Sequence, residues 1–144
     1  MRAVAVFPRS KEIRLVDHPE PRLEKASDVL ARVLEVGICG TDREIASFLY
    51  GDAPPGQDRL VIGHESLGEV TEVGEAVTSL AAGDLVVWMV RRPCGRLQCR
   101  PCQAGRQDFC VTGDFTERGI KGADGFLTEL VVDHERYAIK VPGE

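Results

Sequence analysis

The stretch Leu60-Val-Ile-Gly-His-Glu-Ser-Leu-Gly-Glu-Val-Thr-Glu-Val73 shows a pattern that repeats along the chain. Two apolar runs, Leu60–Ile62 and Leu67–Val73, stand on either side of a His-Glu pair that follows a glycine. Short runs rich in Val, Ile and Leu, punctuated by the 15 Gly and 8 Pro of the chain, are typical of strands and turns rather than long helices. Further runs occur at Ala3–Phe7, Ile13–Val16, Val29–Val36, Asp84–Val90, Phe126–Val132 and Tyr137–Val141. The sequence therefore predicts a mainly β fold with a barrel-like core.

Length, composition and charge exclude several classes of protein. The 144 residues, 43% hydrophobic and 28% charged, fit one domain over residues 1–144. No apolar stretch approaches the ~20 residues that a membrane helix needs, and no basic segment followed by an apolar core opens the chain. We therefore expect a cytoplasmic protein with no membrane contact. The net charge of -5, with both signs interspersed, argues against a nucleic-acid partner.

One short helix is predicted after the strand Val29–Val36. Thr41-Asp-Arg-Glu44 has the pattern of a capping box, and Ile45, Phe48 and Leu49 follow at helical spacing. The next segment, Tyr50–Arg59, holds two Pro and two Gly with little apolar content, and this composition predicts a surface loop.

Four of the five cysteines lie within 17 positions, at Cys94, Cys99, Cys102 and Cys110. Zn²⁺ prefers four thiolates in a tetrahedron, and a Cys-x-x-Cys turn presents two sulfurs to one ion. In a chain without a secretory signal, thiols are usually reduced, so we expect a structural zinc site in preference to two disulfides or unligated buried thiols. Such a site is closed by its protein ligands and has no position for a substrate.

The fifth cysteine suggests a second metal site. Cys39 lies where a predicted strand meets the predicted helix, and His64 and Glu65 directly follow another strand. One sulfur, one imidazole and one carboxylate suit a catalytic zinc with an open position. The alternatives are a buried cysteine and a histidine that only makes hydrogen bonds.

Taken together, Cys39-Gly-Thr-Asp, Gly63-His-Glu and the cysteine-rich lobe at 94–110 resemble the N-terminal catalytic domain of zinc-dependent medium-chain dehydrogenases. The resemblance covers nearly the whole chain. Within this family the chain resembles the glucose 1-dehydrogenase branch most specifically. The motifs that carry this resemblance are Cys39-Gly-Thr-Asp-Arg-Glu-Ile45, Arg91-Arg92, Thr112-Gly-Asp-Phe115, Glu117, Gly119-Ile120 and Asp124-Gly-Phe126. The implied fold is a partly open GroES-like β-barrel with short helices and a zinc lobe.

The resemblance assigns roles to five residues of the second site. Cys39 and His64 match the family's catalytic zinc ligands, and Glu65 matches a carboxylate that binds the metal directly or through water. Thr41 matches a hydroxyl that contacts the substrate and relays its proton, although capping alone would also explain it. Asp42 matches a residue beside the site, which we assign to orienting His64, although a first-turn helix charge is the simpler explanation.

Two acidic residues also match the family, whereas the spacing of the first two lobe cysteines differs from it. Asp114 and Glu117 match acidic residues near the sugar substrate, and solvated loop carboxylates are the alternative. Four residues separate Cys94 from Cys99, whereas the family usually has two. The assignment of Cys99, Cys102 and Cys110 to the structural zinc is therefore firmer than that of Cys94.

The implied reaction is the oxidation of an aldose, D-glucose at C1, by hydride transfer to NAD or NADP. No Gly-x-Gly-x-x-Gly occurs in the chain, so we expect the nucleotide-binding Rossmann domain to be absent from it and the isolated chain to be inactive. The family's full-length enzymes imply a homo-oligomer. The alternatives are another zinc alcohol or polyol dehydrogenase, of sorbitol or threonine type, and a non-catalytic zinc-stapled β-domain that binds a protein partner.

Overall fold

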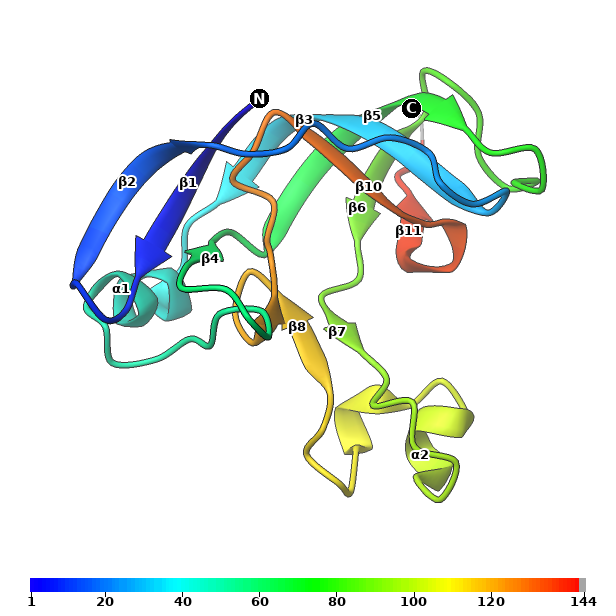
Figure 1. Cartoon of the computed structure of the whole chain (residues 1–144). Helices are drawn as coiled ribbons and strands as arrows, with labels where there is room; N and C mark the ends of the chain where they lie inside the picture. Colours follow the sequence, from blue (N-terminus) through cyan, green and yellow to red (C-terminus); the bar gives the residue numbers. More distant parts are fainter. Residues whose placement is uncertain (143–144) are drawn as a thin grey trace.

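Strands dominate residues 1–142, which the computed structural model describes (Figure 1). They are β1 (Arg2–Phe7), β2 (Glu12–Asp17), β3 (Asp28–Gly37), β4 (Leu60–Val61), β5 (Glu65–Val73), β6 (Leu85–Trp88), β7 (Arg91–Arg92), β8 (Thr116–Arg118), β9 (Gly122–Ala123), β10 (Leu130–His134) and β11 (Ala138–Lys140). The helical elements are α1 (Gly40–Ala46), α2 (Arg100–Gln103) and the 3-10 turns η1 (Gln107–Phe109) and η2 (Glu135–Tyr137). The predicted mainly β class is confirmed.

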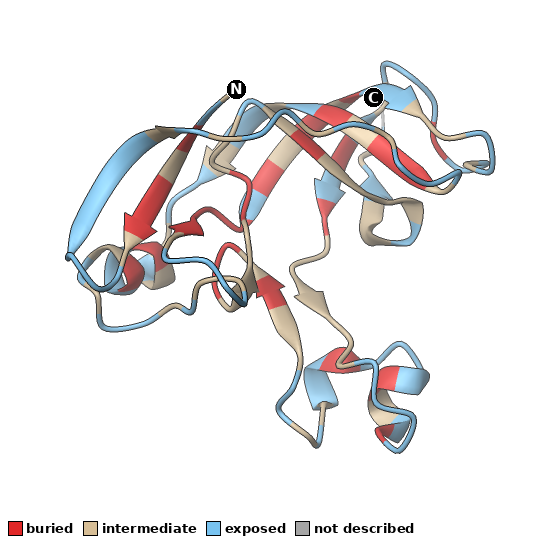
Figure 2. Cartoon of the chain, viewed as in Figure 1, coloured by how far each residue is buried: buried red, intermediate tan, exposed pale blue. Residues whose placement is uncertain are grey.

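The largest sheet has five antiparallel strands in the order β10-β3-β5-β6-β11. Its inner face carries a buried cluster that includes Val29, Val70, Val86 and Phe126, and Trp88 stacks on Phe126 with ring centroids 6.3 Å apart. A second sheet, β2-β1-β4, curls beside it, and the outer strand β2 is mostly exposed (Figure 2). The two sheets form a curled, partly open barrel. This agrees with the barrel-like core that the apolar runs predict and with the partly open fold that the family resemblance implies.

Helix α1 closes one side of the β2-β1-β4 sheet. Ile45, at the spacing that the sequence analysis identified, is fully buried and packs in a cluster with Val6 and Leu60. Burial of an aliphatic side chain of this size contributes about 2 kcal/mol. The apolar face of α1 thus fixes the helix against β1 and β4.

The cap of α1 differs from the prediction. The helix begins after Cys39, whose Sγ accepts the Thr41 N–H at 3.3 Å, while the Asp42 carboxylate accepts the Cys39 N–H at 2.9 Å. The capping box therefore lies two residues before the predicted one. The helix ends at Ala46, and Phe48 has a φ of 59°, so the prediction that Phe48 continues the helix is wrong.

The strands predicted over Phe126–Val132 and Asp84–Val90 are shorter in the structure. In the run Phe126–Val132 the strand begins only at Leu130, because the Leu127 N–H donates to the Ile62 carbonyl instead of joining the large sheet. The run Asp84–Val90 ends as a strand at Trp88, where the chain leaves toward the cysteine-rich lobe. The predicted loop Tyr50–Arg59 is confirmed as irregular, apart from an isolated bridge at Asp52.

The cysteine-rich lobe, which with its return segment extends over residues 94–115 in the structure, projects away from the two sheets (Figure 1). It leaves the body after β7 and returns through β8, and these strands pair with each other before β8 pairs with β9. Among the described residues, no helix is long and apolar enough to cross a membrane.

Three glycines meet at one carbonyl group beside the start of β5. A Cβ on Gly119 or on Gly125 would lie 2.2 Å from the Gly63 carbonyl oxygen, and Gly63 itself has a φ of 91°. No side chain fits at such a distance. The backbone that leads into His64 therefore packs directly on two other backbone segments.

We predict that Gly125→Ala destabilises the fold by about 1–3 kcal/mol, the usual cost of overpacking. The added methyl would meet the carbonyls of Gly63 and Ile62, which are backbone atoms held by hydrogen bonds. Urea unfolding measures the change. Gly40→Ala is the control, because a Cβ there meets nothing within 4 Å; equal stability of the two variants would contradict the prediction.

Candidate metal centres

The pairing of β3 with β5 brings the first set of candidate ligands together. Gly37 at the end of β3 lies opposite Glu65 at the start of β5, so Cys39 and His64 face each other across this edge. The ligand atoms of Cys39, His64 and Glu65 all lie within 4.8 Å of one another. Cys39 Sγ and His64 Nε2 are 3.3 Å apart.

Asp42 supports both Cys39 and His64. Its carboxylate accepts the Cys39 N–H through Oδ2, and its Oδ1 lies 3.4 Å from His64 Nδ1. The Asp42 side chain is 3% exposed, and within residues 1–142 neither Asp42 Oδ1 nor His64 Nδ1 has a hydrogen bond that meets strict geometry. A histidine with Nδ1 toward a carboxylate and Nε2 toward a sulfur is oriented as zinc-binding histidines usually are. These residues therefore fit a zinc ion.

A hollow of about 460 Å³ opens beside these residues. Its lining includes His64 and Glu65 together with Leu67, Val87 and Trp88 of the neighbouring strands β5 and β6. Thr41 does not line this hollow; its backbone N–H donates to Cys39 Sγ at 3.3 Å. The structure thus brings Cys39, Asp42, His64 and Glu65 together, with Thr41 on the helix turn behind the sulfur.

The four cysteines of the lobe form a second set. The sulfurs of Cys94, Cys99, Cys102 and Cys110 lie within 4.8 Å of one another, so the longer gap after Cys94 still brings its sulfur into the group. Cys99 and Cys102 are buried, and Cys99 Sγ is 3.9 Å from Cys110 Sγ. Four sulfurs at this separation match the donor set of a structural zinc.

The surroundings of these thiols favour thiolates at two positions. The pKa of Cys110 is lowered to about 6, first by the hydroxyl of Thr112, whose Oγ1 lies 3.4 Å from the sulfur. The pKa of Cys99 is also lowered, chiefly by the backbone N–H of Cys102. At Cys102 the backbone N–H of Cys94 favours the thiolate, but burial and the neighbouring thiols outweigh it and raise the pKa to about 12. A bound dication would remove this opposition.

The two acidic candidates lie apart from the hollow beside His64. Asp114 is half exposed, forms an ion pair with Arg96 at 2.9 Å and lines a separate hollow of about 470 Å³. Glu117 is buried, and its Oε1 accepts from Arg91 at 2.9 Å. Sequence reasoning missed these arginine partners, because 18 and 26 residues separate them from Asp114 and Glu117.

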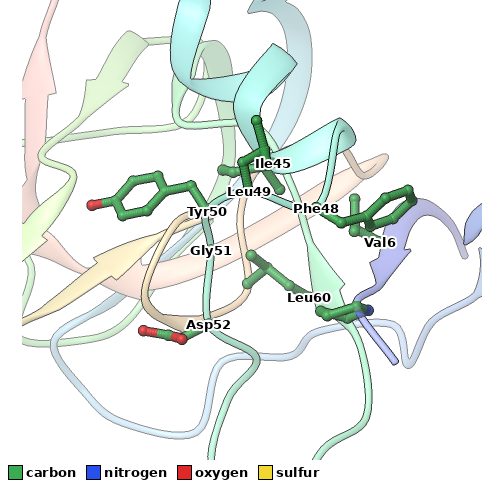
Figure 3. A pocket seen from close by; sticks show the side chains of 9 residues that line it. Val6, Ile45, Phe48, Leu49, Tyr50, Gly51, Asp52 and Leu60 are labelled. Atoms are coloured by element: carbon green, nitrogen blue, oxygen red, sulfur yellow. The ribbon is translucent and has the colours of Figure 1, made fainter. Parts of the chain in front are cut away.

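A further hollow of about 250 Å³ lies under α1 (Figure 3). Ile45, Leu60 and Val6 form its apolar floor, while Tyr50 and Asp52 stand at its edge. None of the metal-site residues lines it. We therefore place the candidate site at the two clusters of metal-ligating side chains.

A family model, the alcohol dehydrogenase GroES-like domain, matches residues 25–143. The chain belongs to this family. The match spans both clusters of metal-ligating side chains and every strand from β3 onward.

Similar proteins include two glucose 1-dehydrogenases. The one from Methanocella arvoryzae is 44% identical over 99% of this chain and 39% of its own length, and the one from Thermoproteus tenax is 44% identical over 100% and 40%. The solved structure of Haloferax mediterranei glucose dehydrogenase in complex with NADP, Zn and gluconolactone aligns with a TM-score of 0.87, at 35% identity over 99% of this chain and 39% of that one. The GroES-like chain therefore spans about two fifths of the length of these relatives.

We predict that Asp42→Asn weakens metal binding at Cys39, His64 and Glu65 by about 10–100-fold, the usual cost of losing a carboxylate behind a metal-binding histidine. Competition with a chelator measures the affinity. Glu44→Gln is the control, because Glu44 lies on the same helix and is exposed. Unchanged affinity in Asp42→Asn would show that Asp42 serves the GroES-like domain only as part of the helix cap.

We predict an order of alkylation in the metal-free chain. At about pH 7, above the lowered pKa of Cys110 and far below that of Cys102, an alkylating reagent modifies Cys110 first and Cys102 last. Thr112→Val removes the hydroxyl donor, raises the Cys110 pKa and slows its modification several-fold.

Peptide mass mapping over time gives the rate at each cysteine. Thr71→Val is the control, because the Thr71 hydroxyl donates to the Leu30 carbonyl in the large sheet, away from the lobe. Equal rates at Cys110 and Cys102 would be incompatible with this order.

Proposed function

We propose that this chain is the catalytic domain of a zinc-dependent dehydrogenase that oxidises an aldose, D-glucose at C1, by hydride transfer to NAD or NADP. The observation that carries the proposal is the cluster of Cys39, His64 and Glu65, with Asp42 beside His64 Nδ1. Support for the sugar comes from the glucose 1-dehydrogenases that resemble 99–100% of the chain.

In this proposal Cys39 and His64 hold a catalytic zinc, and Glu65 completes the set directly or through water. Zinc bound there acts as a Lewis acid that lowers the pKa of the sugar hydroxyl. Asp42 keeps the proton of His64 on Nδ1, which leaves Nε2 free to bind the metal. The Thr41 hydroxyl accepts the proton that the C1 hydroxyl loses and passes it toward solvent, while the C1 hydride leaves for the nicotinamide.

We assign the sugar contacts to Thr41, Asp114 and Glu117. Asp114 is accessible, and its exposed ion pair with Arg96 is worth less than about 1 kcal/mol, so a sugar hydroxyl can compete for the carboxylate. Glu117 is held by Arg91 on the paired strand, which fixes its orientation. In this proposal Cys94, Cys99, Cys102 and Cys110 hold a structural zinc that keeps the lobe folded.

The nicotinamide nucleotide is assigned to residues outside this chain. No Gly-x-Gly-x-x-Gly occurs in residues 1–144, and the chain spans 39% of the Methanocella arvoryzae relative. We propose that residues 1–144 form the GroES-like catalytic domain of a cytoplasmic homo-oligomer that includes a nucleotide-binding domain. Its partners are sugar and nucleotide, without nucleic acid or membrane.

Zinc counting tests the two proposed metal sites. We expect native mass spectrometry of the chain to show one tightly held zinc, lost in Cys94→Ser, and a second, more weakly held zinc, lost in His64→Ala. His134→Ala is the control, because His134 lies outside both metal clusters. A second zinc that survives His64→Ala would refute the assignment of the catalytic site.

Activity tests the proposed reaction. The 144-residue chain alone is expected to form no NADH or NADPH from glucose, because it carries no assigned nucleotide site. In the protein extended by its nucleotide-binding domain, glucose is expected to be oxidised and Cys39→Ser to abolish turnover with unchanged folding. Faster oxidation of sorbitol or threonine than of glucose would overturn the substrate, and full turnover by Cys39→Ser would overturn the mechanism.

A further inference from the structure

The segment that precedes His64 is held by a turn from a distant part of the chain. The Gly125 N–H donates to the Val61 carbonyl at 2.7 Å and the Phe126 N–H to the Gly63 carbonyl at 2.9 Å. The Asp124 carboxylate accepts the Val61 N–H at 2.8 Å. The turn 124–127 is thus hydrogen-bonded to the peptide groups of residues 61 and 63, which directly precede His64.

Arg118 ties this turn to the body of the domain. Its Nε donates to the Asp124 carbonyl, and its Nη1 donates to the Asp133 carboxylate of β10 at 2.7 Å. The guanidinium also lies over the Phe126 ring, 4.8 Å from its centroid. The Arg118 side chain is only 19% exposed, so these contacts are largely shielded from water. A single side chain therefore connects β8, β10 and the turn.

We propose that Arg118 is a positioning residue for His64, acting through the turn 124–127 on the Gly63 carbonyl. The inference rests on the proposed role of His64 as a metal ligand, and it assigns Arg118 no contact with metal or substrate. Gly63 has a left-handed φ of 91°, and the Phe126 N–H fixes the direction of its carbonyl. A rotation of this peptide would turn His64 away from both Asp42 and Cys39.

The contacts of the proposed metal site allow the His64 ring to rotate very little. His64 Nδ1 is 3.4 Å from Asp42 Oδ1, at the outer limit of a hydrogen bond, and Nε2 is 3.3 Å from Cys39 Sγ. For the ring to bind a metal ion, Nδ1 must stay directed at the Asp42 carboxylate while Nε2 stays directed at the metal position. Because Gly119 and Gly125 pack on the Gly63 carbonyl, a displaced turn also disturbs the contact that keeps this peptide in place.

Arg92 offers a matched control. It also donates to the Asp133 carboxylate, is as well shielded as Arg118 and stacks over the Tyr137 ring at 3.9 Å. It makes no hydrogen bond to the turn 124–127 within the described part of the chain. Arg92→Gln therefore removes an equivalent ion pair from the same carboxylate and leaves the link through the Asp124 carbonyl intact.

The first test follows the imidazole tautomers by nitrogen-15 NMR in the metal-free chain at about pH 8, above the ordinary pKa of imidazole. The contacts predict a proton on Nδ1 of His64, beside Asp42, and on Nε2 of His134, whose Nδ1 accepts the Arg136 N–H at 3.1 Å. In Arg118→Gln we expect the His64 signals to average between tautomers while those of His134 stay unchanged. In Arg92→Gln we expect both histidines to keep their tautomers.

The second test measures Co²⁺ binding, since the one-thiolate and four-thiolate sites give different absorption bands. We expect Arg118→Gln to weaken the one-thiolate site by about 10-fold and to leave the four-cysteine site unchanged. Arg118→Lys keeps a charge for Asp133 but has no planar fork for two partners, so partial recovery is expected. If Arg118→Gln fails to fold, Arg118→Lys must still show the selective loss.

Two results would overturn the positioning role. One is a fixed His64 tautomer and unchanged Co²⁺ affinity in a folded Arg118 variant. The other is equal damage in Arg92→Gln, which would assign the effect to the Asp133 cluster as a whole. The wild-type chain could also bind no Co²⁺ at His64 while the His64 tautomer still responds to Arg118→Gln. This result would support the positioning role of Arg118 and contradict the proposed catalytic metal site.

Discussion

The antiparallel pairing of β3 with β5 is the constraint on which the rest of the structure depends. The β3–β5 register, with Gly37 opposite Glu65, joins two points 25 residues apart, Cys39 and His64. A shift of one residue would move every β5 side chain to the other face. It would carry Val70 out of the core and Glu65 away from Cys39 together. Core packing and the metal-ligand cluster are therefore specified by the same register.

The Asp42 side chain makes two contacts with different purposes: it caps helix α1 and it lies beside the distant residue His64. As the third residue of α1 it caps the helix by accepting the Cys39 N–H, which is a purely local interaction. Its other oxygen faces His64 Nδ1 from a buried position, where an unpaired carboxylate would be costly. The helix start is consequently stabilised by the same arrangement that orients the histidine. Helix α1 in turn is anchored through Ile45 to the β1–β4 sheet.

Much of the fold was predictable because it depends on local pattern. The apolar runs around Leu60–Val73 predicted strands that the structure confirms, and the motifs at Cys39 and His64 indicated residues that the structure brings together. The cap of α1 was not predictable from capping-box spacing alone, since a cysteine sulfur replaces the expected threonine oxygen. The irregular path before Leu130 escaped prediction, because hydrogen bonds to 61–63 override its apolar composition. No sequence pattern indicated the contacts of Arg118. One of its partners is a backbone carbonyl, that of Asp124, and the other, Asp133, lies 15 residues away in the sequence.

The lobe enters and leaves the body at neighbouring points. Arg91 pairs with Glu117 and Arg92 with Thr116, so the 23 residues between Arg92 and Thr116 begin and end side by side. A segment closed at its base in this way can change length without moving the strands that carry it, because loop-closure cost rises only slowly with length. The wider gap between Cys94 and Cys99 is an instance of that freedom. The base of the lobe therefore leaves the length of its loops free, whereas the segments around Gly63 pack backbone against backbone, so a change in one of them displaces the others.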